Sequence, residues 1–261
     1  MVSEIIDLYN SGMSSDKMGK LYNLSRMYIL NLLRSNNCYI KNYSDLNKKY
    51  KINESIFDNI SSEESAYFLG FLFSDGNVST KNNTIRLKLN NRDEGILLRL
   101  SNIISPNKPL YKSDNNLILQ FSSEHIKTRL IELGCVPNKS LKITYPNLEN
   151  CDNHFIRGYF DGDGSIVRYK NDFSITIIST ESFCKSIENI IYDKFKIHGS
   201  LNKSKYKNNI TTVFRYTGNR RVEKIMSWLY EDATIYLYRK YNRYLELKKW
   251  ISEVDSRKIK K

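Results

Sequence analysis

Two stretches of the sequence place an aspartate and a glycine at the end of a short apolar run. They are YFLGFLFSDGNV, from Tyr67 to Val78, and FIRGYFDGDGSI, from Phe155 to Ile166. Asp75 and Asp163 hold equivalent places, 88 positions apart (163 minus 75), so the chain contains an internal repeat. Carboxylate oxygens bind hard divalent cations, and Mg²⁺ suits sites that also recruit phosphate oxygens. The repeated aspartates therefore indicate a site for a divalent cation.

The apolar run before each aspartate predicts a helix with a glycine near its middle. Glycine inside a helix costs about 1 kcal/mol relative to alanine, a cost that is acceptable where a second backbone must approach closely. Gly70 and Gly158 are equivalent in the two copies. We therefore expect the two helices to pack through these glycines about a pseudo-two-fold axis, which brings Asp75 and Asp163 together. Helix C-termini and neighbouring acids both disfavour carboxylates, so something positive must sit there.

The hydrophobic pattern predicts the same order of elements in both copies. The strictly alternating segment 84–90, TIRLKLN, is typical of a strand with one apolar and one basic face. The fold class expected is α+β, a pseudo-two-fold pair of αββαββα repeats at 63–150 and 151–261 that form β-saddles. The expected helices are 66–73, 93–104, 124–133, 153–161, 181–192, 221–230 and 236–250, and the expected strands are 84–90, 109–111, 116–121, 165–169, 173–178, 200–206 and 210–216.

Residues 1–42 predict a separate, small all-α unit, followed by a polar linker over 43–62. A short turn at Tyr22 to Leu24 between two helices resembles the helix-turn-helix of resolvase-like DNA-binding modules. That resemblance implies that the third helix enters the major groove, offering Arg26, Tyr28, Asn31 and Arg34 to bases or phosphates. The alternative is a three-helix bundle that only caps the next domain.

Charge favours a polyanionic partner. The chain has 41 Lys and Arg against 28 Asp and Glu, a formal net charge of +13, together with 19 Tyr and 11 Phe. The alternative is a basic composition without such a partner. The four cysteines form no C-x-x-C pair, and the three histidines are scattered, which disfavours a zinc ribbon or a histidine-based nuclease centre. The lack of a long apolar run or a signal peptide predicts a soluble, intracellular protein that binds no membrane.

Residues 68–76, FLGFLFSDG, and 156–164, IRGYFDGDG, align without gaps to the nine-residue signature of the LAGLIDADG homing endonucleases. The resemblance covers both repeats, from about residue 62 to the C-terminus, and corresponds to the single-chain, two-motif type. It implies that Asp75 and Asp163 are catalytic and bind Mg²⁺ or Mn²⁺. The first copy departs from the signature at Phe73, where the family has an acid that is not essential.

The family also places a lysine near each half of the catalytic centre. The resemblance assigns this part to Lys139 in the first copy and to Lys240 in the second. Such a lysine could stabilise charge developing on phosphorus or position the attacking water. The alternative is an ordinary contact to a DNA phosphate.

The resemblance implies a monomer that cuts both strands of double-stranded DNA at a long asymmetric site, by hydrolysing one phosphodiester in each strand. Strand side chains would supply recognition, since a two-stranded ribbon fits the major groove. Each candidate is individually more typical of a phosphate contact than of base reading. The candidates are Arg86, Lys88, Asn90, Gln120, Arg168, Lys170, Lys203, Lys205 and Arg215.

Two other functions compete with cleavage. A calcium loop starting at Asp161 would need glycine at its sixth position and glutamate at its twelfth, where the chain has Ile166 and Asp172. A LAGLIDADG-derived RNA maturase or DNA-binding regulator that has lost cleavage is the stronger alternative. Against it, both Asp75 and Asp163 are present. The expected location is the cytoplasm of a bacterium or phage-infected cell, or an organelle.

Overall fold

The computed structural model describes residues 1–261 except 12, 39, 41–49, 149, 207–208 and 260–261. The chain divides into two compact units, Met1–Lys49 and Tyr50–Lys261. Most of the first half of the expected linker, 43–49, lies outside the described residues. Its second half packs onto the second unit, because the short 3₁₀ turn η1 (Glu54–Phe57) buries Phe57 completely in that unit's core.

The N-terminal unit contains three helices in its described part, α1 (Val2–Asn10), α2 (Ser15–Tyr22) and α3 (Arg26–Ser35). Serine side chains cap the second and third, since Ser14 Oγ accepts from the backbone N–H of Lys17 and Ser25 Oγ from that of Tyr28. Asn23 ends α2 in the left-handed conformation, with φ of 53°. These local signals produce the helices that the sequence predicts. The fully or nearly fully buried apolar residues of this unit are Ile5, Tyr9, Met18, Ile29 and Leu33.

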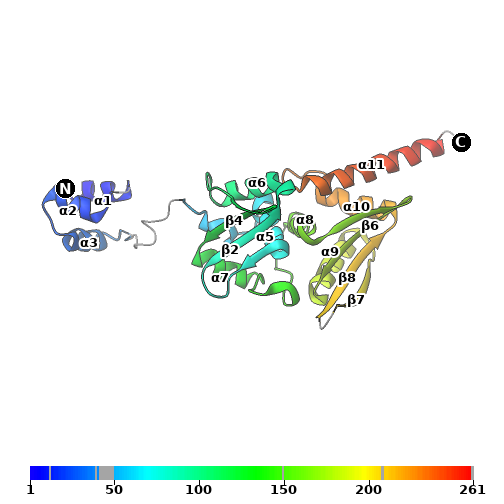
Figure 1. The fold of residues 1–261 in the computed structure, drawn as a ribbon, viewed down its shortest axis with the longest axis horizontal. Helices are drawn as coiled ribbons and strands as arrows, with labels where there is room; N and C mark the ends of the chain where they lie inside the picture. The colour runs from blue at the N-terminus through cyan, green and yellow to red at the C-terminus, as the bar shows by residue number, and fades with distance from the viewer. Residues whose placement is uncertain (12, 39, 41–49, 149, 207–208, 260–261) are drawn as a thin grey trace. The chain divides into compact units, whose positions relative to one another are not determined.

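The second unit contains two copies of one arrangement (Figure 1). The first copy comprises α5 (Glu63–Asp75), β1 (Gly76–Val78), β2 (Thr84–Asn90), α6 (Glu94–Ile104), β3 (Tyr111–Ser113), β4 (Asn116–Ser122) and α7 (Glu124–Glu132). The second comprises α8 (Asp152–Asp163), β5 (Ser165–Tyr169), β6 (Asp172–Ser179), α9 (Glu181–Phe195), β7 (Ser200–Tyr206), β8 (Asn209–Thr217) and α10 (Asn219–Tyr230), followed by α11 (Tyr238–Ile259).

The two sheets have the same topology, antiparallel throughout, with strand orders β1-β2-β4-β3 and β5-β6-β8-β7 in the described residues. The α+β class and the paired repeats are therefore confirmed. Strand β1 was not predicted from the sequence, because its three residues are too few to show alternation. The predicted last helix also ends too early, since α11 continues past Trp250 to Ile259. The segment after Trp250 contains no glycine or proline to stop a helix.

Each sheet has one face packed against helices and one outward face. Strand β2 buries Ile85, Leu87 and Leu89 and exposes the residues between them, as its alternating sequence predicts. In the second sheet β6 buries Phe173, Ile175 and Ile177 in the same way. The outward faces are consequently built from every second residue of each strand.

Helices α5 and α8 pack against each other between the two sheets (Figure 1). A Cβ atom added to Gly70 would lie 2.1 Å from the carbonyl oxygen of Phe155, and one added to Gly158 would lie 2.1 Å from that of Tyr67. The expected crossing of two backbones through the equivalent glycines is confirmed. One continuous apolar core runs through both repeats as a result.

Within the described residues, no helix combines the length and apolar character needed to span a bilayer.

Candidate active site

The C-terminal ends of α5 and α8 meet, and each ends in one of the two repeated aspartates. Asp75 is the last residue of α5 and Asp163 the last of α8. A Cβ atom added to Gly162, next to Asp163, would lie 1.9 Å from Ser74 Oγ and 2.7 Å from Asp75 Oδ2. Glycine at this position therefore lets the end of one helix lie directly against the end of the other.

The electrostatics of the two carboxylates show that they share one site. Desolvation, and after it the nearby charge of Asp163, raise the pKa of Asp75 to about 6 against the opposing effects of Lys139, Arg239 and Lys240. Desolvation also raises the pKa of Asp163, opposed by the same two lysines. Both side chains reach solvent, yet the protein packed around them removes part of their hydration. Two acids held this close favour a bound cation.

Each lysine named in the sequence analysis is anchored at the end of the helix from its own repeat. Lys139 Nζ donates to the carbonyl oxygen of Ser74 at 2.5 Å. Lys240 Nζ donates to the carbonyl oxygens of Phe160, at 3.0 Å, and Gly164. Lys240 is 5% exposed, and burial lowers its pKa to about 8. The structure thus brings one aspartate and one lysine from each repeat to a single place.

Asp161, two residues before Asp163, has a different environment. Its buried carboxylate accepts hydrogen bonds from Tyr67 Oη at 2.7 Å, from Tyr230 Oη and from the backbone N–H of Leu237 at 2.7 Å. These bonds tie the segment before α11 to α8. Asp161 is therefore a structural carboxylate.

The equivalent residue of the first repeat is Phe73, 88 positions earlier (161 minus 73). Its ring packs against Phe155, with centroids 5.1 Å apart, and stacks on Phe183 at 6.3 Å. The departure from the signature at Phe73 therefore exchanges a buried polar anchor for a buried ring and removes no carboxylate from the site.

A buried ion pair that the sequence analysis missed positions the chain leading into α11. Arg157, 1% exposed, donates to Glu63 Oε1 at 2.5 Å and to the backbone carbonyls of Leu229 and Ile235. Glu63 also accepts from the backbone N–H of Thr234 at 2.8 Å. The sequence signal was an arginine inside the apolar run FIRGYF of α8, where only a partner makes burial tolerable.

Arg239 is a second residue that sequence reasoning missed. Its Nε lies 3.3 Å from Asp93 Oδ1, and its charge opposes the raised pKa of Asp75. Its position beside Lys240 was the only sequence signal.

The first sheet presents its candidate recognition residues on the outward face. Arg86, Lys88 and Asn90 are all exposed, and Gln120 lies opposite Arg86 in the ladder. Arg86 Nε donates to Gln120 Oε1 at 2.5 Å. The expected basic face is therefore present on this sheet.

The second sheet places its candidates differently. Arg215 is exposed on the outward face, and Lys170 occupies the β5–β6 turn with φ of 52°. The other three candidates, Arg168, Lys203 and Lys205, lie on the helix-covered side of the sheet instead. Arg168 and Lys203 are in register with buried residues of the neighbouring strands, and Lys205 lies two residues after Lys203 on the same face.

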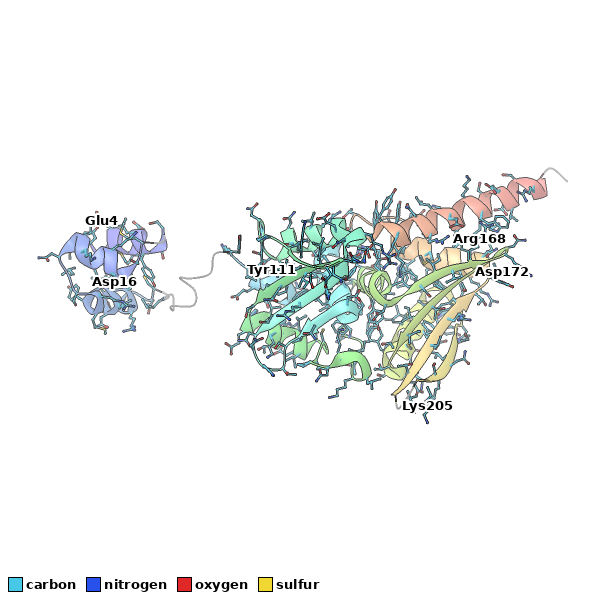
Figure 2. All side chains as sticks on the ribbon, in the orientation of Figure 1. Glu4, Asp16, Tyr111, Arg168, Asp172 and Lys205 are labelled. Carbon is cyan, nitrogen blue, oxygen red and sulfur yellow. The ribbon has the colours of Figure 1, made fainter. Side chains whose placement is uncertain are left out.

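Their contacts agree with that placement. Arg168 lies beside α11 (Figure 2), where it forms an ion pair with Glu246 at 3.2 Å and lies over the Trp250 ring. Lys203 Nζ lies 3.3 Å from Glu181 of α9. Of the second sheet's strand candidates, these three therefore lie on the opposite face from Arg215, and their role in binding DNA stays a prediction. Strand β5 has apolar residues on both faces and β7 is polar at nearly every position, so alternation gave no guide to their orientation.

The four candidates of the N-terminal unit are exposed on α3. Arg34 donates to Asn31 Oδ1 at 3.2 Å, and Arg26 Nε lies 3.8 Å from Asp16 Oδ2. Tyr28 is 50% exposed. Their role in binding DNA stays a prediction.

The donor set at the helix ends fits Mg²⁺. The described residues contain no group of three His, Cys, Asp or Glu side chains placed to hold a metal ion. Two aspartates at a pair of helix ends would supply oxygen ligands, and water and phosphate oxygens would complete the shell. Mg²⁺ characteristically retains several waters and binds through one or two carboxylates together with substrate phosphates.

Comparison with known proteins identifies this fold. Residues 150–229 match the model of the LAGLIDADG-like domain. Among solved structures, the chain is similar to the LAGLIDADG homing endonuclease I-GzeII in complex with its DNA target, with a TM-score of 0.50 and 12% identity over 75% of this chain and 91% of that one. It is equally similar to the LAGLIDADG homing endonuclease I-SmaMI bound to cleaved DNA, with a TM-score of 0.50 and 13% identity over 76% and 92% of the two chains. No curated protein has a significantly similar sequence. The chain therefore has the LAGLIDADG fold, with a LAGLIDADG-like domain in its second repeat.

Proposed function

We propose that this chain, with its LAGLIDADG fold, is a site-specific endonuclease that hydrolyses one phosphodiester in each strand of double-stranded DNA with the help of Mg²⁺ or Mn²⁺. The observation that carries the proposal is the meeting of α5 and α8, which gathers Asp75, Asp163, Lys139 and Lys240 at one place. I-GzeII and I-SmaMI, which share the fold, are described as bound to DNA. The net charge of +13 suits the same partner.

Asp75 and Asp163 would hold the metal in their deprotonated form. Because the pKa of Asp75 is about 6, proton and metal compete for this site below neutral pH. Bound Mg²⁺ would supply Lewis-acid stabilisation of the charge on the phosphate oxygens.

The lysines would add positive charge beside the same phosphates. Lys240, with a pKa of about 8, can hold or release a proton close to neutral pH, as a group that positions water or stabilises developing charge requires. Its anchors on the carbonyls of Phe160 and Gly164 fix the amine relative to Asp163.

Both repeats belong to one chain, so a monomer suffices to cut both strands. The residues at matching positions of the two outward faces differ, for example Arg86 in the first sheet and Thr176 in the second. Such a surface suits an asymmetric target. Because the substrate would be cellular or plasmid DNA, we place the activity inside a cell or an organelle.

The second candidate function is a LAGLIDADG-derived RNA maturase or DNA-binding regulator without cleavage. The separate N-terminal helical unit favours the regulator, because helix pairs of this kind commonly contact DNA. Against it, a protein that only binds gains nothing from two neighbouring carboxylates facing a polyanion, since they repel the phosphates.

A plasmid library separates the two functions. The purified full chain is incubated with plasmids that carry genomic or randomised inserts, with Mg²⁺, with Mn²⁺ or with EDTA, and linear products are sequenced at their ends. We expect linear DNA with one shared end sequence in the presence of metal and none in EDTA. Stable binding without metal-dependent linear product from any insert would contradict the endonuclease and favour the binding protein.

A further inference from the structure

Each of the two sheets carries one arginine at an equivalent place beside the active site. Asn77 and Ser165 follow the glycines after the two catalytic aspartates and are the first outward-facing residues of β1 and β5. Asn77 lies in register with Arg86 of β2, and Ser165 with Thr176 of β6.

The next strand in each sheet completes a matching pair. Arg86 of β2 lies in register with Gln120 of β4, and Thr176 of β6 with Arg215 of β8. The two pairs, Arg86–Gln120 and Thr176–Arg215, therefore occupy equivalent positions of the two ladders. Each contains one arginine and one oxygen acceptor, with the arginine on opposite members of the pair.

Both arginines are held through the same side-chain atom, Nε. Arg86 Nε donates to Gln120 Oε1 at 2.5 Å, and Arg215 Nε donates to Thr176 Oγ1 at 3.2 Å. Each partner is half-buried, while each arginine is exposed on the outward face. With Nε engaged, the two terminal nitrogens of each guanidinium remain as a parallel pair of donors.

Neither guanidinium is neutralised by an acid within the described part of the chain. This distinguishes the two residues from Arg157, Arg168 and Arg239, which form ion pairs with Glu63, Glu246 and Asp93. A fixed, unpaired fork of two donors matches the O6 and N7 acceptors of guanine in the major groove.

Resting on the proposed function, we propose that Arg86 and Arg215 each read one guanine, on opposite sides of the cut, and that Gln120 and Thr176 are positioning residues for them. Along the strand, the pairs lie about two residues, or about 7 Å, beyond the catalytic aspartates. That is about two base-pair steps of B-DNA, so the guanines fall among the innermost base pairs that the sheets can reach.

The test is selection of bound duplexes from a randomised library by the full chain without added metal, followed by affinity measurements at several salt concentrations. The wild type should select a G·C pair at one inner position of each half-site. Arg86→Lys and Arg215→Lys keep the charge but lose the fork. Each should lose about tenfold to a hundredfold of the guanine preference in its own half only, with an unchanged salt dependence.

Matched variants separate base reading from phosphate contact and from positioning. Lys88→Ala, on the same outward face, should weaken binding to all sequences alike and reduce the salt dependence. Gln120→Leu and Thr176→Val should lower the guanine preference while the arginines remain, with little change in the affinity for other sequences. Variants at Gln120 and Thr176 that bind as the wild type does would overturn the positioning roles.

An unchanged base preference in both Arg86→Lys and Arg215→Lys would overturn guanine reading by the arginines. The absence of a selected guanine at the inner positions of both half-sites would do the same. Cleavage by the wild type is assayed separately on the selected duplexes with Mg²⁺. Cleavage with unchanged preferences refutes this inference and leaves the endonuclease standing, whereas altered preferences without cleavage support the inference and refute the endonuclease.

Discussion

Replacing Gly70 by alanine tests the helix contact on which the active site depends. The added Cβ would lie 2.1 Å from the carbonyl oxygen of Phe155 and 2.8 Å from the backbone nitrogen of Tyr159. An ordinary contact begins at 3.4 Å, so α5 and α8 must separate by about 1.3 Å (3.4 minus 2.1). Both opposing atoms belong to the backbone of α8 and cannot rotate away.

The expected cost is that of overpacking, about 1–3 kcal/mol or more, reduced by up to about 1 kcal/mol because alanine favours the helix. We expect a net loss of about 2 kcal/mol from the free energy of unfolding. Cleavage should fall further, because the separation moves Asp75 away from Asp163.

Urea unfolding followed by tryptophan fluorescence is a suitable assay, since both tryptophans, Trp228 and Trp250, lie in the second unit. The matched control is Gly95→Ala in α6, where no atom lies within 4 Å of an added Cβ. This control should be neutral or slightly stabilising. A Gly70→Ala protein as stable and as active as the control would refute the close contact between the helices.

Three further predictions concern charged groups. Arg157→Met leaves Glu63 without its partner and should lower the free energy of unfolding by about 3 kcal/mol in urea denaturation, whereas Glu231→Gln, at an exposed ion pair with Lys248, should change it little. The folded pKa of Asp75, about 6, exceeds the ordinary value of 3.8, so the contribution of this carboxyl to stability is complete below pH 3.8 and is lost as pH rises through 6. Asp75→Asn should therefore gain stability over the wild type between pH 4 and 7.5 in EDTA, and no such gain would contradict the shift. Burial lowers the pKa of Lys240 from 10.5 to about 8, so protonation destabilises the fold below pH 8 and this penalty is relieved as pH rises to 10.5. The stability of the wild type relative to Lys240→Met should accordingly rise between pH 8 and 10.5, and a flat difference would refute the assignment.

Local sequence patterns predicted most of the fold. The alternation of TIRLKLN gave the orientation of β2. The repeat offset predicted the close approach of α5 and α8 at Gly70 and Gly158, because equivalent helix-breaking residues in two copies have a shared structural reason.

Contacts between distant residues were beyond local patterns. The ion pair of Arg157 with Glu63 joins residues 94 positions apart, and its partners on the segment before α11 are also distant in sequence. The structural role of Asp161 depends on Tyr230 and Leu237 for the same reason.

The faces of β5 and β7 were also not predictable. Strand β7, SLNKSKY, is polar at nearly every position, so only its pairing with β8 shows that Lys203 turns toward Glu181. The positions of the two lysines at the site came from the family resemblance, since spacing alone does not bring Lys139 to Ser74.

In the proposed function, one aspartate from each repeat completes a single metal-dependent centre that cuts both strands. Its most direct test is plasmid linearisation at the identified target with Mg²⁺ by the wild type, Asp75→Asn, Asp163→Asn and the control Asp193→Asn, which alters an exposed aspartate on α9. We predict that each active-site variant loses linear product yet binds the target as tightly as the wild type, while the control cuts normally. Undiminished linearisation by Asp75→Asn or Asp163→Asn would contradict the account.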